Sequence, residues 1–273
     1  MLDKQQVNLH FSRHAQNYDN YAVVQKNMAQ KLGEMLQKGR APETILEIGC
    51  GTGNYTRILA EQYPEAQIVA TDISPDMLAV TREKLACYPN IVYQVADGEC
   101  LQLGQTFDLI TSNAVFQWFE NYEEMFRSYA EHLNVGGRLV YATFGQRTFY
   151  ELHDAFAQAY AKLDCRKQGI HGPKFATSEE LLQASGQSDW ESGFTEEDFI
   201  QFFPSVKEFL TAVKKVGANN ASKSEQRLTN RNLLLQMIKE YEAAYMTEHG
   251  IRTTYHVIYA RHEKSERSSC ADA

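Results

Sequence analysis

An acidic residue two positions ahead of three alternating glycines is the feature of this sequence that points most clearly to chemistry. Glu47 precedes Gly49, Gly51 and Gly53. Glycines let a ligand approach the backbone more closely than a Cβ atom allows, and they accept positive φ angles. In a dinucleotide site such a loop holds a pyrophosphate at a helix N-terminus, whereas a nearby carboxylate suits a cationic ligand better. The alternatives to a site for a cationic ligand are a NAD site and a purely structural glycine turn.

The residues around this loop predict the elements that position it. Residues 44–48 form a short run rich in apolar and β-branched side chains, and residues 54–60 carry apolar side chains at helical spacing. Strand, turn and helix therefore follow one another. Further strand-like segments lie at 66–72, 91–95, 107–113 and 138–144. Strands that alternate with helical patterns predict a mostly parallel sheet with helices on both faces.

Polar residues stand where three of these strands end. Asp72 ends the second strand, about 20 residues past the first glycine, where a ribose-binding carboxylate is expected. Asp97 and Asn113 follow the third and fourth strands. Because ligands of such sheets lie beyond the carboxyl ends of the strands, these side chains are expected to gather around one site. Asp72 as a helix N-cap and Asp97 as a turn residue before Gly98 are the structural alternatives.

The glycine loop and these polar residues together resemble the class I S-adenosylmethionine-dependent methyltransferases, whose cofactor carries a sulfonium and an ammonium group. The resemblance implies that Asp72 binds the ribose hydroxyls and that Asp97 accepts a hydrogen bond from the adenine amino group. It places Gly98 and Glu99 next to the adenine and assigns the methionine part to Glu47 and the glycine loop. The other cofactor-binding positions that it implies are Gly49, Cys50, Gly51, Gly53, Ile73, Met77, Asn113, Ala114 and Gln117.

The N-terminal segment predicts a helix over residues 11–25. Four of its side chains share one helical face, namely Phe11, Ala15, Tyr18 and Ala22. A helix that merely packs on the sheet explains this pattern, but the phrase Phe-x-x-x-Ala-x-x-Tyr-Asp resembles an N-terminal lid over the cofactor. The resemblance implies that Tyr18 points its hydroxyl towards the site of methyl transfer. His14 and Asp19 are expected to be surface or capping residues.

The segment after residue 145 contains more helix than coverage of a sheet requires. Helices are predicted at 146–160, from 177, at 205–217 and at 229–245, with strands at 197–203 and 253–260. We interpret the excess as a cap that encloses a substrate and excludes water. The predicted fold is α/β, of the class I methyltransferase type. It has a seven-stranded, mostly parallel sheet, an N-terminal helical lid and a helical cap inserted after strand five and before the last strand.

These elements divide the chain into five predicted parts. They are a lid (1–40), a cofactor-binding core (41–145), a cap with a late strand (146–235), the last helix and strand of the core (236–262) and a frayed tail (263–273).

Two phrases in the cap sharpen the resemblance. They are Phe-Gly-x-x-Thr-x-x-Glu-Leu at 144–152 and the segment 206–219. Together with the lid, the glycine loop and residues 113–119, they resemble the malonyl-carrier O-methyltransferases of biotin synthesis over nearly the whole chain. His14 and Phe116 depart from the residues expected there. The resemblance implies methylation of the free carboxylate of a malonyl thioester, on acyl carrier protein or coenzyme A, to the ester that primes pimeloyl and biotin synthesis.

Such a reaction makes modest demands on the side chains. A malonyl carboxylate is already ionised at neutral pH, so the rate depends on alignment and needs no general base. The carboxylate requires a cation or hydrogen-bond donors, for which the candidates are Tyr18, Arg147, Lys214 and Lys215; arginine is best suited to a bidentate contact. A solvated helix face is the alternative for each basic residue.

Other functions remain open at this point. They are methyl transfer to another acid, a quinone carbon or an amine, cofactor binding without turnover, and nicotinamide-dependent oxidoreduction.

Composition limits the partners. The net charge of −8 argues against nucleic-acid binding as the main task. No apolar run is long enough to span a membrane and no signal peptide is evident, so a cytoplasmic protein is expected. The five cysteines lack metal-type spacing, so no metal site is expected. Residues 203–231 hold six basic and two acidic side chains, an excess that would attract an acidic acyl carrier protein or coenzyme A phosphates.

Overall fold

The computed structural model describes residues 8, 11–12, 18–37, 39–164, 174–186, 190–215 and 231–264. One twisted sheet runs through these residues in the order β3-β2-β1-β4-β5-β8-β6, and the two-residue strand β7 pairs with β8. The strands are β1 (Thr44–Ile48), β2 (Gln67–Asp72), β3 (Ile91–Val95), β4 (Phe107–Asn113), β5 (Leu133–Phe144), β6 (Trp190–Phe203), β7 (Met246–Thr247) and β8 (Gly250–Lys264). Strands β1 to β5 are parallel, whereas β8 is antiparallel to β5 and β6. The predicted α/β methyltransferase-type fold is confirmed, with β7 as a short addition.

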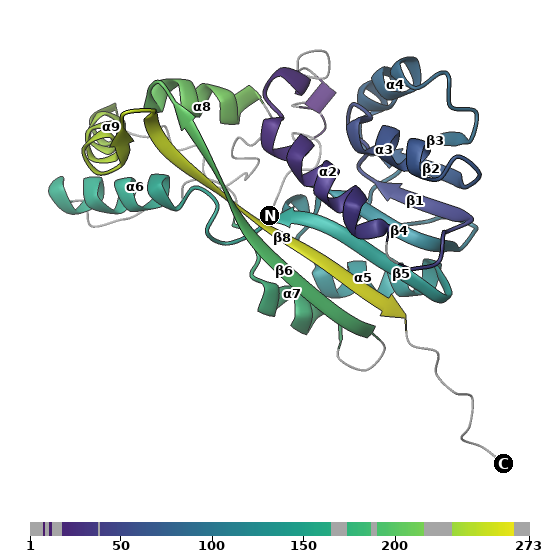
Figure 1. The fold of residues 1–273 in the computed structure, drawn as a ribbon. Helices are drawn as coiled ribbons and strands as arrows, with labels where there is room; N and C mark the ends of the chain where they lie inside the picture. Colours follow the sequence, from purple (N-terminus) through teal and green to yellow (C-terminus); the bar gives the residue numbers. More distant parts are fainter. Residues whose placement is uncertain are drawn as a thin grey trace.

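Helices cover both faces of the sheet (Figure 1). They are η1 (Tyr18–Asn20), α2 (Val23–Leu36), α3 (Asn54–Gln62), α4 (Pro75–Lys84), η2 (Phe116–Trp118), α5 (Tyr122–His132), α6 (Tyr150–Lys162), α7 (Ser178–Ala184), α8 (Val206–Lys215) and α9 (Arg231–Tyr245). Buried side chains of α2, α3 and α4 join one apolar core, and those of α5 and α7 join a second core. None of the helices in the described part of the chain is long and apolar enough to cross a lipid bilayer.

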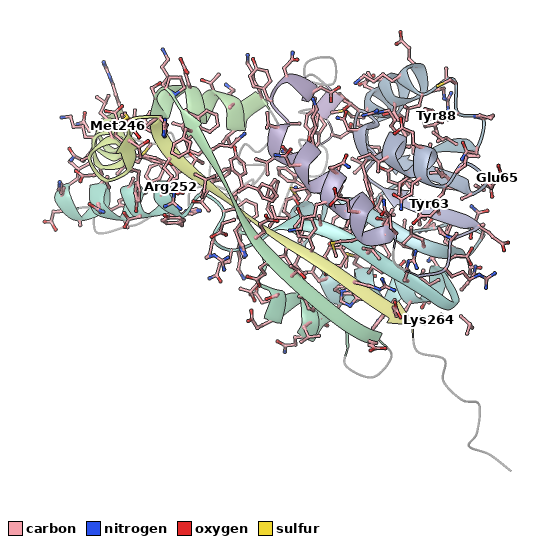
Figure 2. The ribbon with its side chains drawn as sticks, in the orientation of Figure 1. Tyr63, Glu65, Tyr88, Met246, Arg252 and Lys264 are labelled. Carbon is pink, nitrogen blue, oxygen red and sulfur yellow. The ribbon has the colours of Figure 1, made fainter. Side chains whose placement is uncertain are left out.

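The last strands are much longer than the sequence predicts. Strand β6 begins at Trp190 instead of residue 197, and it pairs with β8 as far as Phe203, opposite Ile251. Several side chains of this strand are acidic, and because acidic residues are uncommon in strands, the sequence pattern did not indicate its first half. On an edge strand such charges protect the exposed sheet edge. The antiparallel pair of β6 and β8 extends away from the parallel strands, and α6, α8 and α9 lie at its far end (Figure 1). Arg252 and Lys264 mark the two ends of β8 (Figure 2).

The predicted continuous helix over residues 11–25 is wrong. A 3-10 turn at Tyr18–Asn20, whose Tyr18 backbone oxygen accepts from the nitrogens of Tyr21 and Ala22, is followed by a break before α2. Residues 13–17, with His14 and Ala15, lie outside the described part. Between β4 and α5 the chain forms only a short 3-10 helix, η2.

The phrase at residues 144–152 fastens the cap to the sheet. Thr148 Oγ1 donates to the backbone oxygen of His256 at 2.9 Å and accepts from its backbone nitrogen at 3.1 Å. The fully buried carboxylate of Glu151 accepts from the backbone nitrogen and the hydroxyl of Thr254, at 3.0 and 2.6 Å. Both polar members of the phrase therefore bind β8, and they fix the start of α6 against that strand.

Candidate active site

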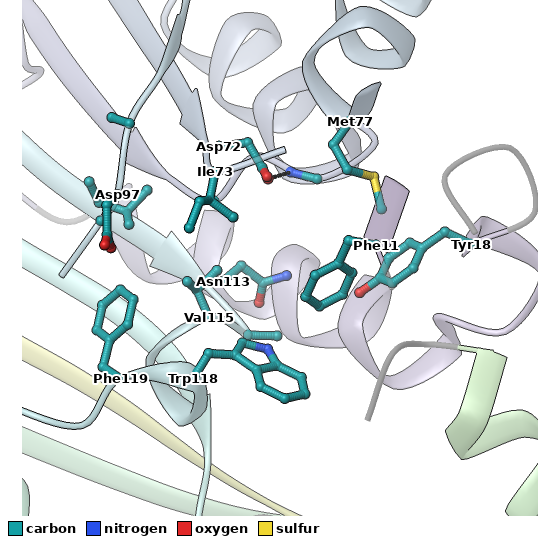
Figure 3. A pocket seen from close by; sticks show the side chains of 16 residues that line it. Phe11, Tyr18, Asp72, Ile73, Met77, Asp97, Asn113, Val115, Trp118 and Phe119 are labelled. Atoms are coloured by element: carbon teal, nitrogen blue, oxygen red, sulfur yellow. Dashed lines mark hydrogen bonds between the residues drawn. The ribbon is translucent and has the colours of Figure 1, made fainter. Parts of the chain in front are cut away.

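A cavity lies beyond the carboxyl ends of β1, β2 and β4, at the point where the strand order reverses (Figure 3). Such a crevice is the usual ligand site of open α/β sheets. Its walls include Gly49 and Gly51 of the glycine loop, Asp72 and Met77. On the other sides are Ile73, Asp97, Gly98, Asn113, Ala114, Val115, Trp118 and Phe119. We call this cavity the first chamber.

The glycine loop presents bare backbone to the first chamber. Gly49 has φ +69°, and a Cβ atom there would lie 2.4 Å from Val115 Cγ2, so this position tolerates no side chain. Gly51 has φ +54° and faces open space, because no protein atom lies within 4 Å of the position that its Cβ would occupy. Gly53 begins α3. The loop leaves a backbone cradle at Gly51 that a ligand can approach closely.

Asp72 joins the wall of the chamber to the glycine loop. Its Oδ2 accepts from the backbone nitrogen of Gly51 at 2.9 Å, and its Oδ1 accepts from that of Ser74 at 2.8 Å. Ser74, and not Asp72, is the N-cap of α4. Burial of the carboxyl group raises the pKa of Asp72 to about 6. A carboxylate offers about four acceptor positions, so Asp72 can also accept from a ligand hydroxyl.

Asp97 and its neighbours shape the opposite end. Asp97 lines the chamber, and its Oδ1 also accepts from the backbone nitrogen of Glu99 at 3.0 Å. Glu99 itself is absent from the wall, since its Oε1 accepts from the backbone nitrogens of Glu120 and Asn121 at 2.7 and 2.6 Å. A Cβ atom at Gly98 would lie 2.3 Å from Ile48 Cγ2, so Gly98 allows close packing at this end.

Two buried acceptors without partners face a smaller cavity beside the glycine loop. Glu47 is 1% exposed, and neither its Oε2 nor Asn113 Oδ1 has a hydrogen-bond partner among the described residues. Both residues line this cavity together with Cys50 and Gly51. Burial, with a contribution from nearby Asp72, raises the pKa of Glu47 to about 8. Because unpaired buried acceptors are costly, the pair fits a ligand that brings a cationic donor such as an ammonium group.

Cys50 is a buried thiol of the same loop. Burial raises its pKa, and the nearby Glu47 and Asp72 act in the same direction. It therefore behaves as a small apolar wall residue and not as a nucleophile.

The lid is tied to the glycine loop by Asp19. Its Oδ1 accepts from Thr52 Oγ1 at 2.6 Å and from Asn54 Nδ2 at 2.7 Å, and its Oδ2 pairs with Lys84. The expectation that Asp19 is a surface or capping residue was wrong. Its partners lie more than 30 residues away in the sequence, so no local pattern could have revealed the contact.

A second chamber adjoins the first. Its walls are Phe11, Tyr18, Gln25, Ala114, Gln117, Trp118, Phe144, Thr148, Phe149, Phe175 and Tyr255. Phe11, Tyr18, Ala114 and Trp118 line both chambers and form the neck between them. Figure 3 shows the three aromatic side chains on the wall of the first chamber. The rings of Phe11 and Trp118 meet edge to face, with their centroids 5.6 Å apart.

Gln117 lines the second chamber and not the first. Its Nε2 donates to the backbone oxygen of Ala114 at 2.6 Å, and its Oε1 accepts from Thr143 Oγ1 at 3.1 Å. Ala114 has φ +58°, so Gln117 stabilises the left-handed residue that shapes the neck. Phe144, Phe149, Phe175 and Tyr255 were not predicted as site residues, because they reach the chamber only through the packing of the cap.

The basic candidates for carboxylate binding lie elsewhere. Arg147 forms ion pairs with Glu196 and Asp198 of β6, at 3.2 and 3.0 Å. Lys215 donates to the Tyr21 hydroxyl and lies over its ring, and Lys214 is exposed on α8. None of the three lines either chamber, whereas Tyr18 lines both.

Comparisons with known proteins agree with this geometry. Residues 45–137 match the family model described as Methyltransferase domain. The chain is 37% identical over 272 residues to a malonyl-[acyl-carrier protein] O-methyltransferase from Acetivibrio thermocellus, covering 97% of this chain and 95% of that protein. A protein of the same name from Anoxybacillus flavithermus is 38% identical over 259 residues, covering 95% and 97%.

A solved structure shares the fold. It is the N-methyltransferase NodS from Bradyrhizobium japonicum WM9 in complex with S-adenosylhomocysteine, at a TM-score of 0.54 and 15% identity, covering 96% of this chain and 100% of that one. The curated relatives exclude the nicotinamide-dependent alternative that the glycine loop alone left open. Because they match at well over 30% identity along nearly their whole length, the chain belongs to the family of malonyl-[acyl-carrier protein] O-methyltransferases.

Proposed function

We propose that this protein transfers a methyl group from S-adenosylmethionine to the free carboxylate of a malonyl thioester, carried on acyl carrier protein or coenzyme A. The curated relatives bear the name of this activity on the carrier protein. The observation that carries the proposal is the character of the second chamber. Its described walls contain no Asp, Glu, His, Lys or Arg, so the site suits an acceptor that arrives already ionised.

The first chamber and its neighbouring cavity fit the cofactor. Glu47 Oε2 and Asn113 Oδ1 are the orphaned acceptors for its ammonium group, and the bare backbone at Gly51 is the surface against which it would lie. Asp72 would hold the ribose hydroxyls, and Asp97 would accept from the adenine amino group. When bound, the cofactor supplies a methyl group on a positively charged sulfur, which an acceptor oxygen takes as the neutral thioether leaves.

The protein's own part in the reaction is then placement and exclusion of water. The neck of aromatic rings suits a sulfonium, because the face of an aromatic ring attracts cations. An amine or phenol acceptor would have to lose a proton, and a general base within hydrogen-bond reach is the usual means. A malonyl carboxylate has no proton to lose near neutral pH, so the absence of such a base from the described walls favours carboxyl methylation.

The direct test is methyl transfer from labelled S-adenosylmethionine to malonyl-carrier protein, malonyl-coenzyme A and free malonate in parallel. We expect base-labile label on a malonyl thioester, since a carboxyl ester is cleaved by base and N-methyl or C-methyl products are not. Free malonate should be inert. Cofactor binding without label on any malonyl compound would refute the substrate and leave the fold intact.

A basic helix lies directly behind the second chamber. Phe209 of α8 packs against Phe149, with ring centroids 5.3 Å apart, and Phe149 lines the chamber. Lys207 and Lys214 are exposed on this helix. We propose that α8 steers an acidic carrier protein to the site by charge complementarity. Lys223 and Arg227, which the sequence adds to the same basic segment, lie outside the described residues.

Charge reversal tests this docking role. Lys207→Glu with Lys214→Glu should lower kcat/KM for malonyl-carrier protein roughly tenfold at low ionic strength, because steering changes the association rate. Turnover of a short malonyl thioester should stay unchanged. Lys215 is left intact because it contacts Tyr21 of the lid. The control variant reverses two charges that lie outside α8, those of Arg40 and Arg127. Equal losses on both substrates would contradict docking through α8.

A further inference from the structure

We propose, on the basis of the carboxyl methyl transfer proposed above, that the hydroxyl group of Tyr255 donates the hydrogen bond that positions the acceptor carboxylate. Tyr255 lies on β8 and lines the second chamber. It lines neither the first chamber nor the cavity beside Glu47. Its hydroxyl therefore serves the acceptor side of the neck alone.

Elimination among the walls singles out this side chain. Gln117 also lines a further cavity, together with Phe119, Tyr122 and Glu180. Five residues line the second chamber and none of the other three cavities, namely Phe144, Thr148, Phe149, Phe175 and Tyr255. Three are phenylalanines. The Thr148 hydroxyl already donates to and accepts from the backbone of His256. Tyr255 carries the remaining polar group of the five.

The environment of Tyr255 prepares its hydroxyl to donate. The side chain is 7% exposed, and its ring is packed edge to face against Phe149, with centroids 4.9 Å apart. Its hydroxyl has no hydrogen-bond partner among the described residues. The hydroxyl oxygen is not completely buried, because it does not belong to the unpartnered polar atoms that solvent cannot reach. Burial raises the pKa of Tyr255, so the phenol keeps its proton throughout the physiological range.

A neutral donor suits this acceptor better than a cation would. A hydroxyl that donates to a carboxylate makes a short, strong hydrogen bond, but it leaves the acceptor's negative charge in place for attack on the methyl group. The ester product has lost that charge, so its hydrogen bond to Tyr255 becomes an ordinary neutral one. The same contact therefore holds the substrate more strongly than the product.

The experiment compares binding of malonyl- and acetyl-acyl carrier protein in the presence of S-adenosylhomocysteine, by calorimetry. The two ligands differ only in the carboxylate. The wild type should prefer the malonyl form. Tyr255→Phe, which removes one oxygen, should raise the Kd of the malonyl form about 10- to 100-fold and leave the Kd of the acetyl form and of S-adenosylhomocysteine unchanged. The KM for the malonyl form should rise in parallel.

Tyr241→Phe is the matched control. Tyr241 is fully buried, and its hydroxyl binds the backbone oxygen of Arg252 at 2.9 Å outside the chamber walls. Removal of the Tyr241 hydroxyl should lower the stability of the protein without altering its preference for malonyl- over acetyl-acyl carrier protein. Equal weakening of both ligands by Tyr255→Phe, no change in either, or a wild type that binds both forms alike would overturn the assignment. A malonyl preference that Tyr255→Phe abolishes, in a protein that transfers no methyl group, would refute the proposed function and leave the assignment standing.

Discussion

Replacing Glu47 by glutamine should weaken S-adenosylmethionine binding by roughly 100-fold, since removing one partner from a buried, charge-assisted contact costs about 2–3 kcal/mol. Glu47 is 1% exposed and presents an unpaired Oε2 to the cavity beside the glycine loop. Glutamine keeps the size and one acceptor oxygen but cannot become an anion. Calorimetric titration with S-adenosylmethionine and S-adenosylhomocysteine measures the loss, because both carry the ammonium group.

The pH dependence of this loss has a definite sign. With a pKa of about 8, Glu47 is mostly protonated near neutral pH in the cofactor-free protein and ionises as the pH rises. The ammonium group favours the ionised form, so the ratio of variant Kd to wild-type Kd should grow between about pH 6.5 and 8. Titration of the ligand itself cancels from that ratio. A constant ratio would contradict a carboxylate contact to the ammonium group.

The stability of the cofactor-free protein should change in the opposite direction to cofactor affinity, because Glu47→Gln is expected to raise it at high pH. The pKa of Glu47 is raised in the folded state, so the native protein binds the extra proton, and stability falls as the pH rises towards 8. Glutamine escapes this loss, and the cofactor-free variant should therefore melt higher than the wild type at pH 8. Glu99→Gln is the control, because Glu99 is also a buried glutamate but does not line the chamber; it should leave the cofactor Kd within a few-fold of the wild type.

The second large effect is expected at Asp72. Both of its carboxylate oxygens accept backbone N–H groups, from Gly51 and Ser74. Asparagine has one acceptor oxygen, and its amide nitrogen would face the other N–H donor. Asp72→Asn should therefore loosen the glycine loop and remove a ribose acceptor together, lowering kcat/KM roughly 100- to 1,000-fold for two lost charge-assisted contacts.

Asp76→Asn is the matched control for Asp72→Asn. Asp76 is exposed in the first turn of α4, four residues after Asp72. The Asp76→Asn variant should bind the cofactor like the wild type. Calorimetry gives the cofactor Kd of each variant, and thermal unfolding separates loss of the ligand contact from loss of structure. A cofactor Kd for Asp72→Asn within threefold of the wild type would argue against a ribose role for this carboxylate.

The parts of the site that sequence could predict share one property, which is that they are local. The strand, the glycine loop and the acid at the end of the next strand lie within a short stretch, and parallel pairing then brings Asp72 and Asn113 to one edge of the sheet. Glu99 and Gln117 show the limit of this reasoning. Each follows a predicted strand by four residues, yet their side chains bind nearby groups of the protein and are absent from the first chamber.

The acceptor side escaped prediction because its walls come from distant segments. Phe11, Phe149, Phe175 and Tyr255 meet only after the lid and cap have folded onto β8. Arg147 was predicted as a carboxylate contact on its chemistry alone, but β6 supplies it with two protein carboxylates. No sequence pattern around residue 147 indicates ion-pair partners that lie about 50 residues away in the chain.

The place of Tyr255 on the last strand has a consequence for synthesis on the ribosome. The segments that form the first chamber emerge early, from the lid to η2, whereas β8 leaves the ribosome near the end of translation. The second chamber lacks a wall until then. A nascent chain can therefore acquire a place for the cofactor well before it acquires one for the acceptor, and only the finished protein holds the two side by side.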